Sequence, residues 1–504
     1  MTNVKRTAFL LSLLLSSTLA GAQQASYTLT LDDCRQLAVE NSKELDQARI
    51  QKEMAGYDRK IAMANYFPKV TATGAYIYNN RDVNLISEEQ SQRLTSAGTA
   101  LDNAFWDALR GQVDVVENAT LRQMALDALA QMQASPNRLD IASPINAIGQ
   151  EVDAVLHPDL HNIWAGTVVV EQPVFVGGKI IYSNQMARLA GELADSRYDM
   201  TQADVLLDVD QAYWQIVSIS NKKKLAESYA GLLHHMEDDV NAAIAEGVST
   251  QSDVLQVKVK VNEADMMLTK ATNGLVLAKM LLCQRVGLPL ESEIRLADEA
   301  LDLIPEPEVP AQKSLEDIYE DRPETRSLEL AGKIYDKKAK VVRADMLPTV
   351  ALMGAYTLTN PNVYNGFQNN WQGGNLSAGV VVKIPIVHGG EGLFRYKKAK
   401  AEARLYEDKL ADARELIGLQ VTQQRKLMDE ARQKLQRALS NMDLAEENLR
   451  AATIGYEAGV LPTNTALAAH TAWLSAHSEC IDAEIELQMA ASNLRKAEGS
   501  YLKK

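Results

Sequence analysis

Two copies of one unit make up this chain, and the repeat constrains its fold more than any local motif does. Residues 41–76 align without a gap on residues 321–356, at a shift of 280, and both segments end in Gly-Ala-Tyr. Residues 168–178 align on residues 380–390 at a shift of 212. Self-similarity over such distances indicates that each half folds into the same structural unit.

The smaller shift locates a 68-residue insertion in the first copy, between Tyr76 and Val168. The length alone would suggest about three domains, but the repeat favours one extended body. The predicted parts are a signal peptide at 1–22, a first repeat at 23–290 that includes the insertion at 77–167, a linker at 291–314 and a second repeat at 315–504.

Each copy is predicted to begin with a helix and to continue into a strand. Residues 31–66 have two acids in the first turn and end at Phe67-Pro68, because the residue before a proline disfavours the helical region. From Val70 on, apolar or small residues alternate with threonines, which is the period of a two-faced strand. The predicted strands are 70–79, 163–173, 350–359 and 375–385, with helix junctions marked by Pro68, Pro173, Gly177, Gly178, Pro348, Pro385, Gly389 and Gly390.

Long helices are predicted after the paired glycines. Each runs for roughly 67 residues, about 100 Å at the α-helical rise, to Ala245 and Glu457. The returning helices place apolar residues at steps of three and four, as coiled coils do, and their many alanines imply close packing. Cys480 lies on this stripe, so we expect it to be buried. We expect Gly247 and Gly459 to close the long helices, because glycine readily takes the left-handed conformation.

The N-terminal 22 residues have the features of a secretory signal: a basic pair, a short apolar run and an Ala-x-Ala cleavage site. Its removal leaves 50 Lys and Arg against 66 Asp and Glu, a net charge of −16, which argues against nucleic acid as a partner. No stretch after residue 22 approaches a transmembrane helix. If the chain enters a membrane, we expect it to do so as β-strands.

Four membrane-type strands cannot close a barrel, since closed membrane barrels need at least about eight and an open edge cannot face lipid. Chains must therefore pool their strands, and the strand count alone permits a dimer as well as a trimer. Aromatic residues gather at the strand ends, where interfacial girdles occur: Tyr76, Tyr78, Trp164, Tyr356, Tyr364, Phe367 and Trp371.

These patterns resemble the TolC family of outer-membrane efflux proteins over nearly all of the mature chain. The shared order is helix, Pro, strand, loop, strand, Pro-x-x-x-Gly-Gly, long helix, Gly-Val turn and helix. The resemblance implies a mixed α and β membrane protein, in which a homotrimer gives a shared β-barrel and a long coiled-coil periplasmic tunnel. It also implies an exit duct for efflux or type I secretion in the outer membrane of a Gram-negative bacterium, with outer-membrane lipid, a periplasmic adaptor (membrane fusion) protein and an inner-membrane pump as partners.

In that family the helical turns form the periplasmic tip that contacts the adaptor. The corresponding residues are Gly247, Val248, Ser249, Asp253 and Leu255 in the first copy and Gly459, Val460, Leu461, Thr465 and Leu467 in the second. The acidic residue of the family's tip is present in the first copy as Asp253, whereas the matching position of the second copy is Thr465. An acidic ring at the entrance therefore depends on Asp253 alone, whose alternative role is a first-turn acid favoured by the helix dipole.

The sequence offers no catalytic constellation, and we predict neither an enzyme nor a cofactor. His157 and His161 have helix-face spacing for a metal, but Pro158 follows the first and no third ligand is apparent, so we interpret them as a loop pair. Two further functions stay open. A periplasmic coiled-coil adaptor without a barrel would explain the heptads, and an enzyme could use the insertion.

The insertion lies between the two strands of the first copy, so it must emerge on the side of the sheet away from the helices. Apolar residues at helical spacing run from Leu94 to Val116 and from Leu121 to Met132. They predict either a helical cap that packs against symmetry mates over the barrel mouth or a lid that packs only on itself. The cap predicts that deleting residues 88–155 raises the leakage of large antibiotics while trimers persist.

Overall fold

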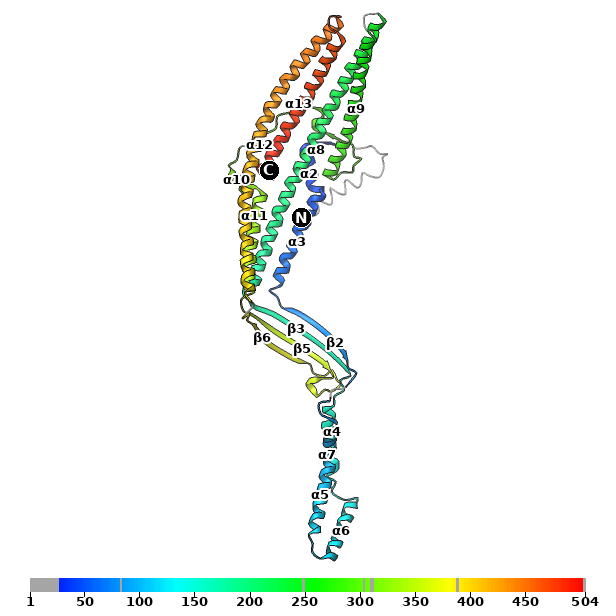
Figure 1. Cartoon of the computed structure of the whole chain (residues 1–504), viewed down its shortest axis with the longest axis vertical. Coiled ribbons are helices and arrows are strands. Elements are labelled where there is room, and N and C mark those ends of the chain that lie inside the picture. The colour runs from blue at the N-terminus through cyan, green and yellow to red at the C-terminus, as the bar shows by residue number, and fades with distance from the viewer. Residues whose placement is uncertain are drawn as a thin grey trace, which may run out of the picture. The chain divides into compact units, whose positions relative to one another are not determined.

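The computed structural model describes residues 27–81, 84–246, 250–301, 304–308, 312–386 and 389–501. They form two compact units (Figure 1). The sheet unit comprises Met63–Ile180 and Arg343–Gly390, and the helical unit comprises the remainder of the described chain.

The helical unit contains most of the helices, and the sheet unit contains four strands and the insertion. The elements of the helical unit are β1 (Tyr27–Leu29), α2 (Leu31–Asn41), α3 (Lys43–Ala64), α8 (Lys179–Ala245), α9 (Gln251–Val286), β4 (Ile294–Leu296), η1 (Ala297–Ala300), α10 (Leu315–Asp321), α11 (Pro323–Ala344), α12 (Glu391–Glu457) and α13 (Thr463–Ala497). The sheet unit has β2 (Lys69–Tyr78), α4 (Glu88–Thr95), α5 (Ala97–Asp114), α6 (Ala119–Ala134), α7 (Ala142–Leu156), β3 (Asn162–Val176), β5 (Thr349–Asn360), η2 (Val363–Asn365) and β6 (Asn375–Lys383).

Corresponding elements of the two halves have matching lengths. Helices α3 and α11 both have 22 residues, and α8 and α12 both have 67. The two hairpins of the sheet also share one register, because Tyr76 lies opposite Trp164 and Tyr356 lies opposite Leu376, at the same shifts of 280 and 212 that relate the sequences. The four strands occupy the predicted segments to within three residues at each end.

The first predicted helix, 31–66, is wrong in one respect, since it is broken at Ser42 into α2 and α3. Ser42 is extended (ψ 126°), and the preceding residue packs on the end of α9: an added Cβ on Gly287 would lie 2.5 Å from Asn41 Cβ. Gly287 itself is left-handed and closes α9. In the second half the corresponding break precedes Pro323, the first residue of α11. Part of the predicted linker is also structured, as β4 pairs in parallel with β1.

The sheet is antiparallel in the order β2-β3-β5-β6, so β2 and β6 are its edges. All residues of β2 and all but one of β6 are exposed, although their side chains are largely apolar. Val70 keeps 67% of its surface exposed and Val380 62%. An apolar sheet exposed on both faces, with two unpaired edges, is incomplete as a water-soluble structure.

The glycine pairs behave alike at both strand-to-helix junctions. Gly177 and Gly178 have φ of 63° and 82°, and Gly389 and Gly390 have φ of 56° and 79°. At the first junction Lys179 Nζ donates to Asp345 Oδ1 at 2.7 Å. The interior strand β3 passes Pro173 with an irregularity before Phe175, whereas the edge strand β6 ends ahead of Pro385.

A buried polar network links three helices of the helical unit. Asp210 of α8 is fully buried and accepts two hydrogen bonds of 2.7 Å from Arg35 of α2. Ser492 of α13 donates to the same carboxylate at 2.7 Å. The Tyr501 hydroxyl also donates to this carboxylate. The carboxylate is therefore both paired and hydrogen-bonded, which a buried charge requires.

The heptad stripes of α9 and α13 are packed as predicted. Cys480 is buried, and burial, with Glu484 and Asp443 nearby, raises the pKa of its thiol to about 11.

The expectation that no later stretch approaches a transmembrane helix is wrong for α9. Among the described residues, this helix is long and apolar enough to cross a membrane by length and composition. The reason is that α9 is apolar on two faces, since Val276 and Leu277 are exposed while Val257 and Leu282 are buried. Its buried stripe packs in the helical unit, so the composition reflects helix packing.

We predict that Gly177→Ala destabilises the fold. An added Cβ would lie 2.7 Å from Ala344 O and would force a side chain into the left-handed region, which costs about 1–3 kcal/mol. The midpoint of denaturant unfolding, followed by tryptophan fluorescence, should fall. The control is Gly56→Ala in the open face of α3, which should be neutral or stabilising by up to about 1 kcal/mol. Equal midpoints for the two variants would contradict the packing described for Gly177.

Candidate functional site at the helical turns

The candidate site is the end of the helical unit where α8 turns into α9 and α12 turns into α13. Gly247, Val248 and Ser249 of the first turn lie outside the described residues. In the second turn Gly459 is left-handed with φ of 70°, as predicted, and its N–H donates to Tyr456 O at 2.9 Å.

The second turn closes tightly on α12. The N–H groups of Val460 and Leu461 both donate to Gly455 O, at 2.9 and 3.0 Å, so one carbonyl at the helix end is doubly satisfied. Val460 is left 77% exposed at the outermost point of the turn. A solvent-facing valine on a rigid turn is a surface that a partner can cover.

Asp253 serves as a helix cap. Its carboxylate accepts from Thr250 N at 3.0 Å and from Thr250 Oγ1 at 2.6 Å, while Asp253 N donates to Thr250 Oγ1 at 3.3 Å. This reciprocal arrangement is a capping box, which satisfies the free N–H groups at the start of α9. Of the two roles open for Asp253, the capping role is present in the structure, and the acidic ring stays a prediction.

The two helical hairpins pack against each other near their turns. Their shared apolar cluster draws on α8, α9 and α13, and includes Met236, Val240, Val254, Val257, Ala466 and Leu467. Leu467, a predicted tip residue, is thus buried in packing, whereas Leu255 on the neighbouring helix is 56% exposed. The aligned leucines of the two copies therefore have different surroundings.

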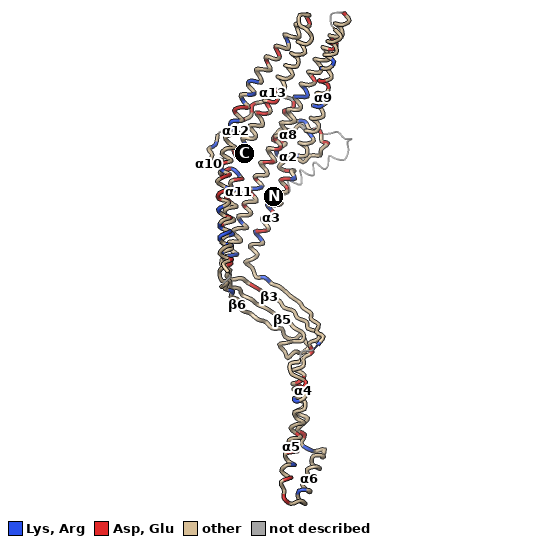
Figure 2. The backbone as a smooth tube through the Cα atoms, viewed as in Figure 1, with Lys and Arg blue, Asp and Glu red and all other residues tan. Residues whose placement is uncertain are grey.

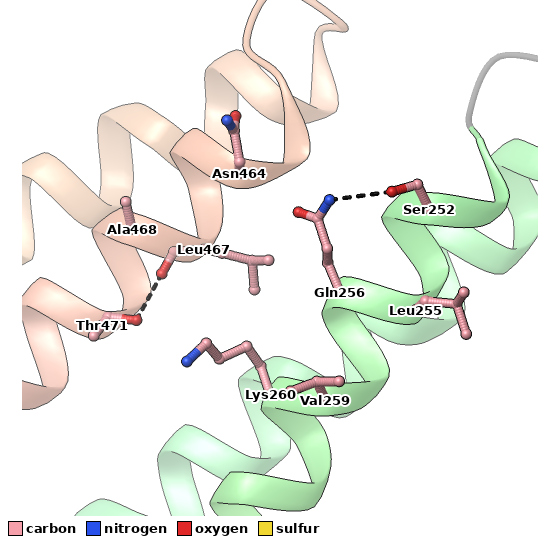
Figure 3. Close-up of a pocket in the computed structure, with 9 residues that line it drawn as sticks. All are labelled: Ser252, Leu255, Gln256, Val259, Lys260, Asn464, Leu467, Ala468 and Thr471. Atoms are coloured by element: carbon pink, nitrogen blue, oxygen red, sulfur yellow. Dashed lines mark hydrogen bonds between the residues drawn. The ribbon is translucent and has the colours of Figure 1, made fainter.

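A groove of about 530 Å³ runs between α9 and α13 beside this cluster (Figure 3). We call it the tip groove. Its lining combines apolar side chains with a few polar ones, as binding sites commonly do: Ser252, Leu255, Gln256, Val259, Lys260, Asn464, Leu467, Ala468 and Thr471. Gln256 Nε2 donates to Ser252 Oγ at 3.3 Å, and Thr471 Oγ1 donates to Leu467 O at 2.9 Å.

A second cavity, of about 970 Å³, opens at the turns and carries acidic groups. Asp239, Asp253 and Glu457 line it together with Tyr456. Burial raises the pKa of the Tyr456 phenol, a hydrogen bond with Thr463 opposes this, and the two aspartates add to the increase. The phenol therefore stays neutral next to these carboxylates.

The structure separates the two sets of predicted site residues. The described tip residues belong to the helical unit, whereas the junction prolines and glycines all belong to the sheet unit. Sequence reasoning did not single out Gln256, Lys260, Asn464 or Thr471. Polar residues on an exposed helix face resemble any solvated face, so no local pattern distinguishes them.

The pair of histidines behaves as a loop pair. His157 Nδ1 lies 3.1 Å from Asp153 O, and His161 Nδ1 lies 3.1 Å from Asp159 Oδ1. Within the described ranges, no group of three or more His, Cys, Asp or Glu side chains could hold a metal ion.

Solved structures show where this fold occurs. CusC, whose structures concern folding and transmembrane channel formation, matches with a TM-score of 0.69 at 12% identity, over 96% of this chain and 95% of that one. The outer membrane channel CmeC of Campylobacter jejuni also gives 0.69, at 13% identity, over 96% and 90% of the two chains. The open state of the MtrE outer membrane channel of Neisseria gonorrhoeae gives 0.64, at 14% identity, over 96% of each.

The sequence also matches a known family over part of its length. Residues 315–500 match the family described as outer membrane efflux protein. A comparison with curated protein sequences gives no match. The matched segment corresponds closely to the second repeat, which retains the family's sequence pattern more closely than the first.

The match to this family bears on three of the predictions. It agrees with the predicted outer-membrane location and with a role in transport instead of catalysis. The resemblance to the TolC family is confirmed with it.

We predict that the charge of Asp253 and its capping role can be separated. Asp253→Asn removes the charge, while Thr250→Ala weakens the cap by about 1 kcal/mol and leaves the charge in place. If Asp253 lines the entrance, Asp253→Asn should lower the preference of the single-channel current for cations, and Thr250→Ala should not. Identical selectivity in both variants and the parent would leave Asp253 with the cap alone.

Proposed function

We propose that the protein is the exit duct of an export system, in which three copies pool their sheets into one β-barrel. The observation that carries the proposal is the four-stranded sheet, which has two unpaired edges and is exposed on both faces. A membrane tolerates strands only as a closed barrel, because unpaired backbone groups cost several kcal/mol each in lipid. Several chains must then supply the strands.

The distribution of charge supports membrane insertion of this sheet (Figure 2). Its only charged residues are Lys69, Glu171 and Lys383, and all three lie near the ends of the strands that lead to the helices. The uncharged remainder of β2 has nine residues, the length of a tilted strand that crosses a bilayer, about 9–11 residues. Charged residues are frequent along the helices, as a periplasmic surface requires.

The repeat supplies a register for the contact between copies. Within one chain the first hairpin joins the second through β3 and β5, where Val169 lies opposite Ala355. Applying the sequence shifts of 212 and 280 to this pair places Val381 of β6 opposite Ala75 of β2 in the next copy. If each copy pairs its β6 with β2 of the next copy around a closed ring, no strand edge is left unpaired.

The aromatic residues fit an interfacial girdle. Tyr76 and Trp164 pack at 4.5 Å between ring centroids, and the Tyr76 hydroxyl donates to Asn162 Oδ1 at 2.8 Å. Both rings remain about half exposed, and so do Tyr364 and Trp371 in the loop between β5 and β6. Amphipathic rings with an apolar body and a polar tip favour the boundary between lipid and water.

The partner that fits the tip groove is a helical hairpin of a periplasmic adaptor, which connects the duct to an inner-membrane pump. An incoming helix would find the apolar side chains of Leu255 and Val259 exposed beside the amide of Gln256 and the ammonium of Lys260. Helices dock in grooves of this kind through apolar anchors with a polar rim. The duct then serves efflux or type I secretion of drugs or other export substrates.

The adaptor alternative, a coiled coil without a barrel, gives no role to the exposed, uncharged strands. Nor does it explain why two hairpins share one register. The duct accounts for both features, and for the heptads.

We predict that Ala75→Cys combined with Val381→Cys gives a disulfide between copies. The repeat places these residues opposite each other in neighbouring strands. Their Cα atoms would then lie within the range of about 4.4–6.8 Å that a disulfide needs. Oxidised samples, boiled without reductant, should run at the mass of a trimer. Native Cys34 and Cys480 are buried, with thiol pKa values raised to about 12 and 11, so they should not compete.

The matched control pairs Ala75→Cys with Ala378→Cys, three residues away on β6, and should not cross-link. A disulfide of Ala75→Cys with Val381→Cys that runs at the mass of a monomer would show a barrel closed within one chain. That result would overturn the shared barrel.

We also predict that Ala468→Trp blocks the adaptor without disturbing the channel. Ala468 is an exposed residue of the tip groove, and an indole there would fill the space that a docking helix needs. Dye accumulation in cells should rise toward the level of cells lacking the channel, while outer-membrane trimers stay at parent levels. The control is Ala472→Trp, which is exposed on the same helix but neither lines the groove nor belongs to the predicted tip residues. Full export by Ala468→Trp would contradict docking in the groove.

A further inference from the structure

The insertion folds as a helical hairpin. Helices α4 and α5 run against α7 and α6, and we call residues 88–156 the insertion hairpin. Glycines allow close approach: an added Cβ on Gly98 would lie 2.3 Å from Ala142 O, and one on Gly149 would lie 2.1 Å from Leu94 O. Helix α7 was not anticipated in the sequence, because its apolar residues are interrupted by small and polar ones.

Polar contacts also hold the hairpin together. Asn146 Oδ1 accepts from Gly98 N at 2.9 Å, and its amide donates to Thr99 Oγ1 at 2.7 Å. Asp102 is buried with Arg138 at 3.6 Å, and Trp106 is buried beside them on the same face of α5. One face of α5 is thus fully used within the chain.

A second face of α5 is apolar and unused. Six residues on it are exposed and step by four and three, the spacing of a coiled-coil seam. They are Ala97, Leu101, Ala104, Ala108 and Gly111 together with Val115, the residue that caps the C-terminal end of the helix, and we call them the α5 stripe.

The stripe is a separate face and not an edge of the packed one. Successive residues of a helix are turned by about 100° around its axis, so the six stripe residues lie within an arc of about 80°. The centre of the packed face, which contains Asp102 and Trp106, lies about 140° around the axis from the centre of the stripe. The stripe carries no charge, since Asp107, Arg110 and Asp114 all lie off it. Leu101 is 53% exposed and Val115 79%.

The other helices add to this exposed apolar surface. Leu121 and Met124 of α6 are 58% and 64% exposed, and Ile148 of α7 is 61% exposed. A two-helix hairpin cannot bury such residues on itself. Contiguous apolar surface on this scale marks an interaction site.

In the proposed barrel the root of the hairpin would lie at the boundary between copies. Strand β2, which leads into the insertion, is the edge strand that would pair with β6 of the next copy. Hydrogen bonds hold this root, as Asn79 N donates to His161 O at 2.8 Å and Leu85 N donates to Leu156 O at 3.1 Å. Closure of such a ring would bring the hairpins of neighbouring copies together, parallel and at the same height.

We propose that the α5 stripes of neighbouring copies pack on one another, so that the insertion hairpins form a parallel helical bundle at the outer mouth of the channel. This proposal rests on the shared barrel proposed above. A parallel arrangement sets each stripe residue against the same residue of the next copy. Alanine and glycine at four of the six positions allow close helix contact, as in the heptads of the tunnel. Of the two alternatives that the sequence left open for the insertion, the bundle corresponds to the helical cap that packs against symmetry mates. It is incompatible with a lid that packs only on itself.

The test is cysteine cross-linking in the full-length protein in outer membranes. Ala104→Cys should give covalent dimers on mild oxidation, because three thiols meet at one level and two of them can join. Ala108→Cys, one step along the stripe, should do the same. The matched control is Asn103→Cys, which is exposed on α5 but lies off the stripe and should give about ten-fold less dimer, because its Cβ vectors point apart.

The outcome is read together with heat-modifiable trimers on gels. Trimers with dimer at Ala104→Cys and Ala108→Cys, and little at Asn103→Cys, support the bundle. Trimers in which all three variants cross-link equally weakly overturn the bundle and leave the shared barrel intact. Loss of trimers in the parent protein would instead overturn the proposed function itself.

Discussion

The architecture depends on a sheet that cannot be satisfied within one chain. Strands β2 and β6 have no neighbours on their outer sides, and both faces expose apolar side chains. In water such a sheet would aggregate, and in lipid its unpaired backbone groups would be too costly. Pairing β6 with β2 of another copy removes both edges at once. The uncharged strands, the aromatic ends and the position of the insertion at the edge strand then follow from one requirement.

The helical unit meets its own constraint with buried polar contacts. Asp210 joins α2, α8 and α13 through Arg35, Ser492 and Tyr501, and an unpaired charge at this depth would be strongly destabilising. The network ties the opening helix of the first repeat to the closing helix of the second. The turns at the far ends of the hairpins, by contrast, are held by a capping box at Thr250 and by the left-handed Gly459, which leaves their outer surfaces open to a partner.

Much of this could be predicted from the sequence because the signals are periodic or repeated. The strands were found by alternation and by their proline and glycine junctions, and the heptads predicted the burial of Cys480. The break at Ser42 was missed because it depends on contact with Gly287, far away in the chain. The Asp210 network was missed for the same reason, as its partners lie 175 to 291 residues away. The tip groove has no sequence signature, since only packing brings Gln256 and Ala468 to one site.

A cryo-EM reconstruction of the protein in lipid nanodiscs would show whether several copies share one barrel. We expect three chains around one closed barrel, each contributing β2, β3, β5 and β6, with Val381 of one chain opposite Ala75 of the next. A barrel closed within a single chain, or a sheet lying outside the bilayer, would contradict it.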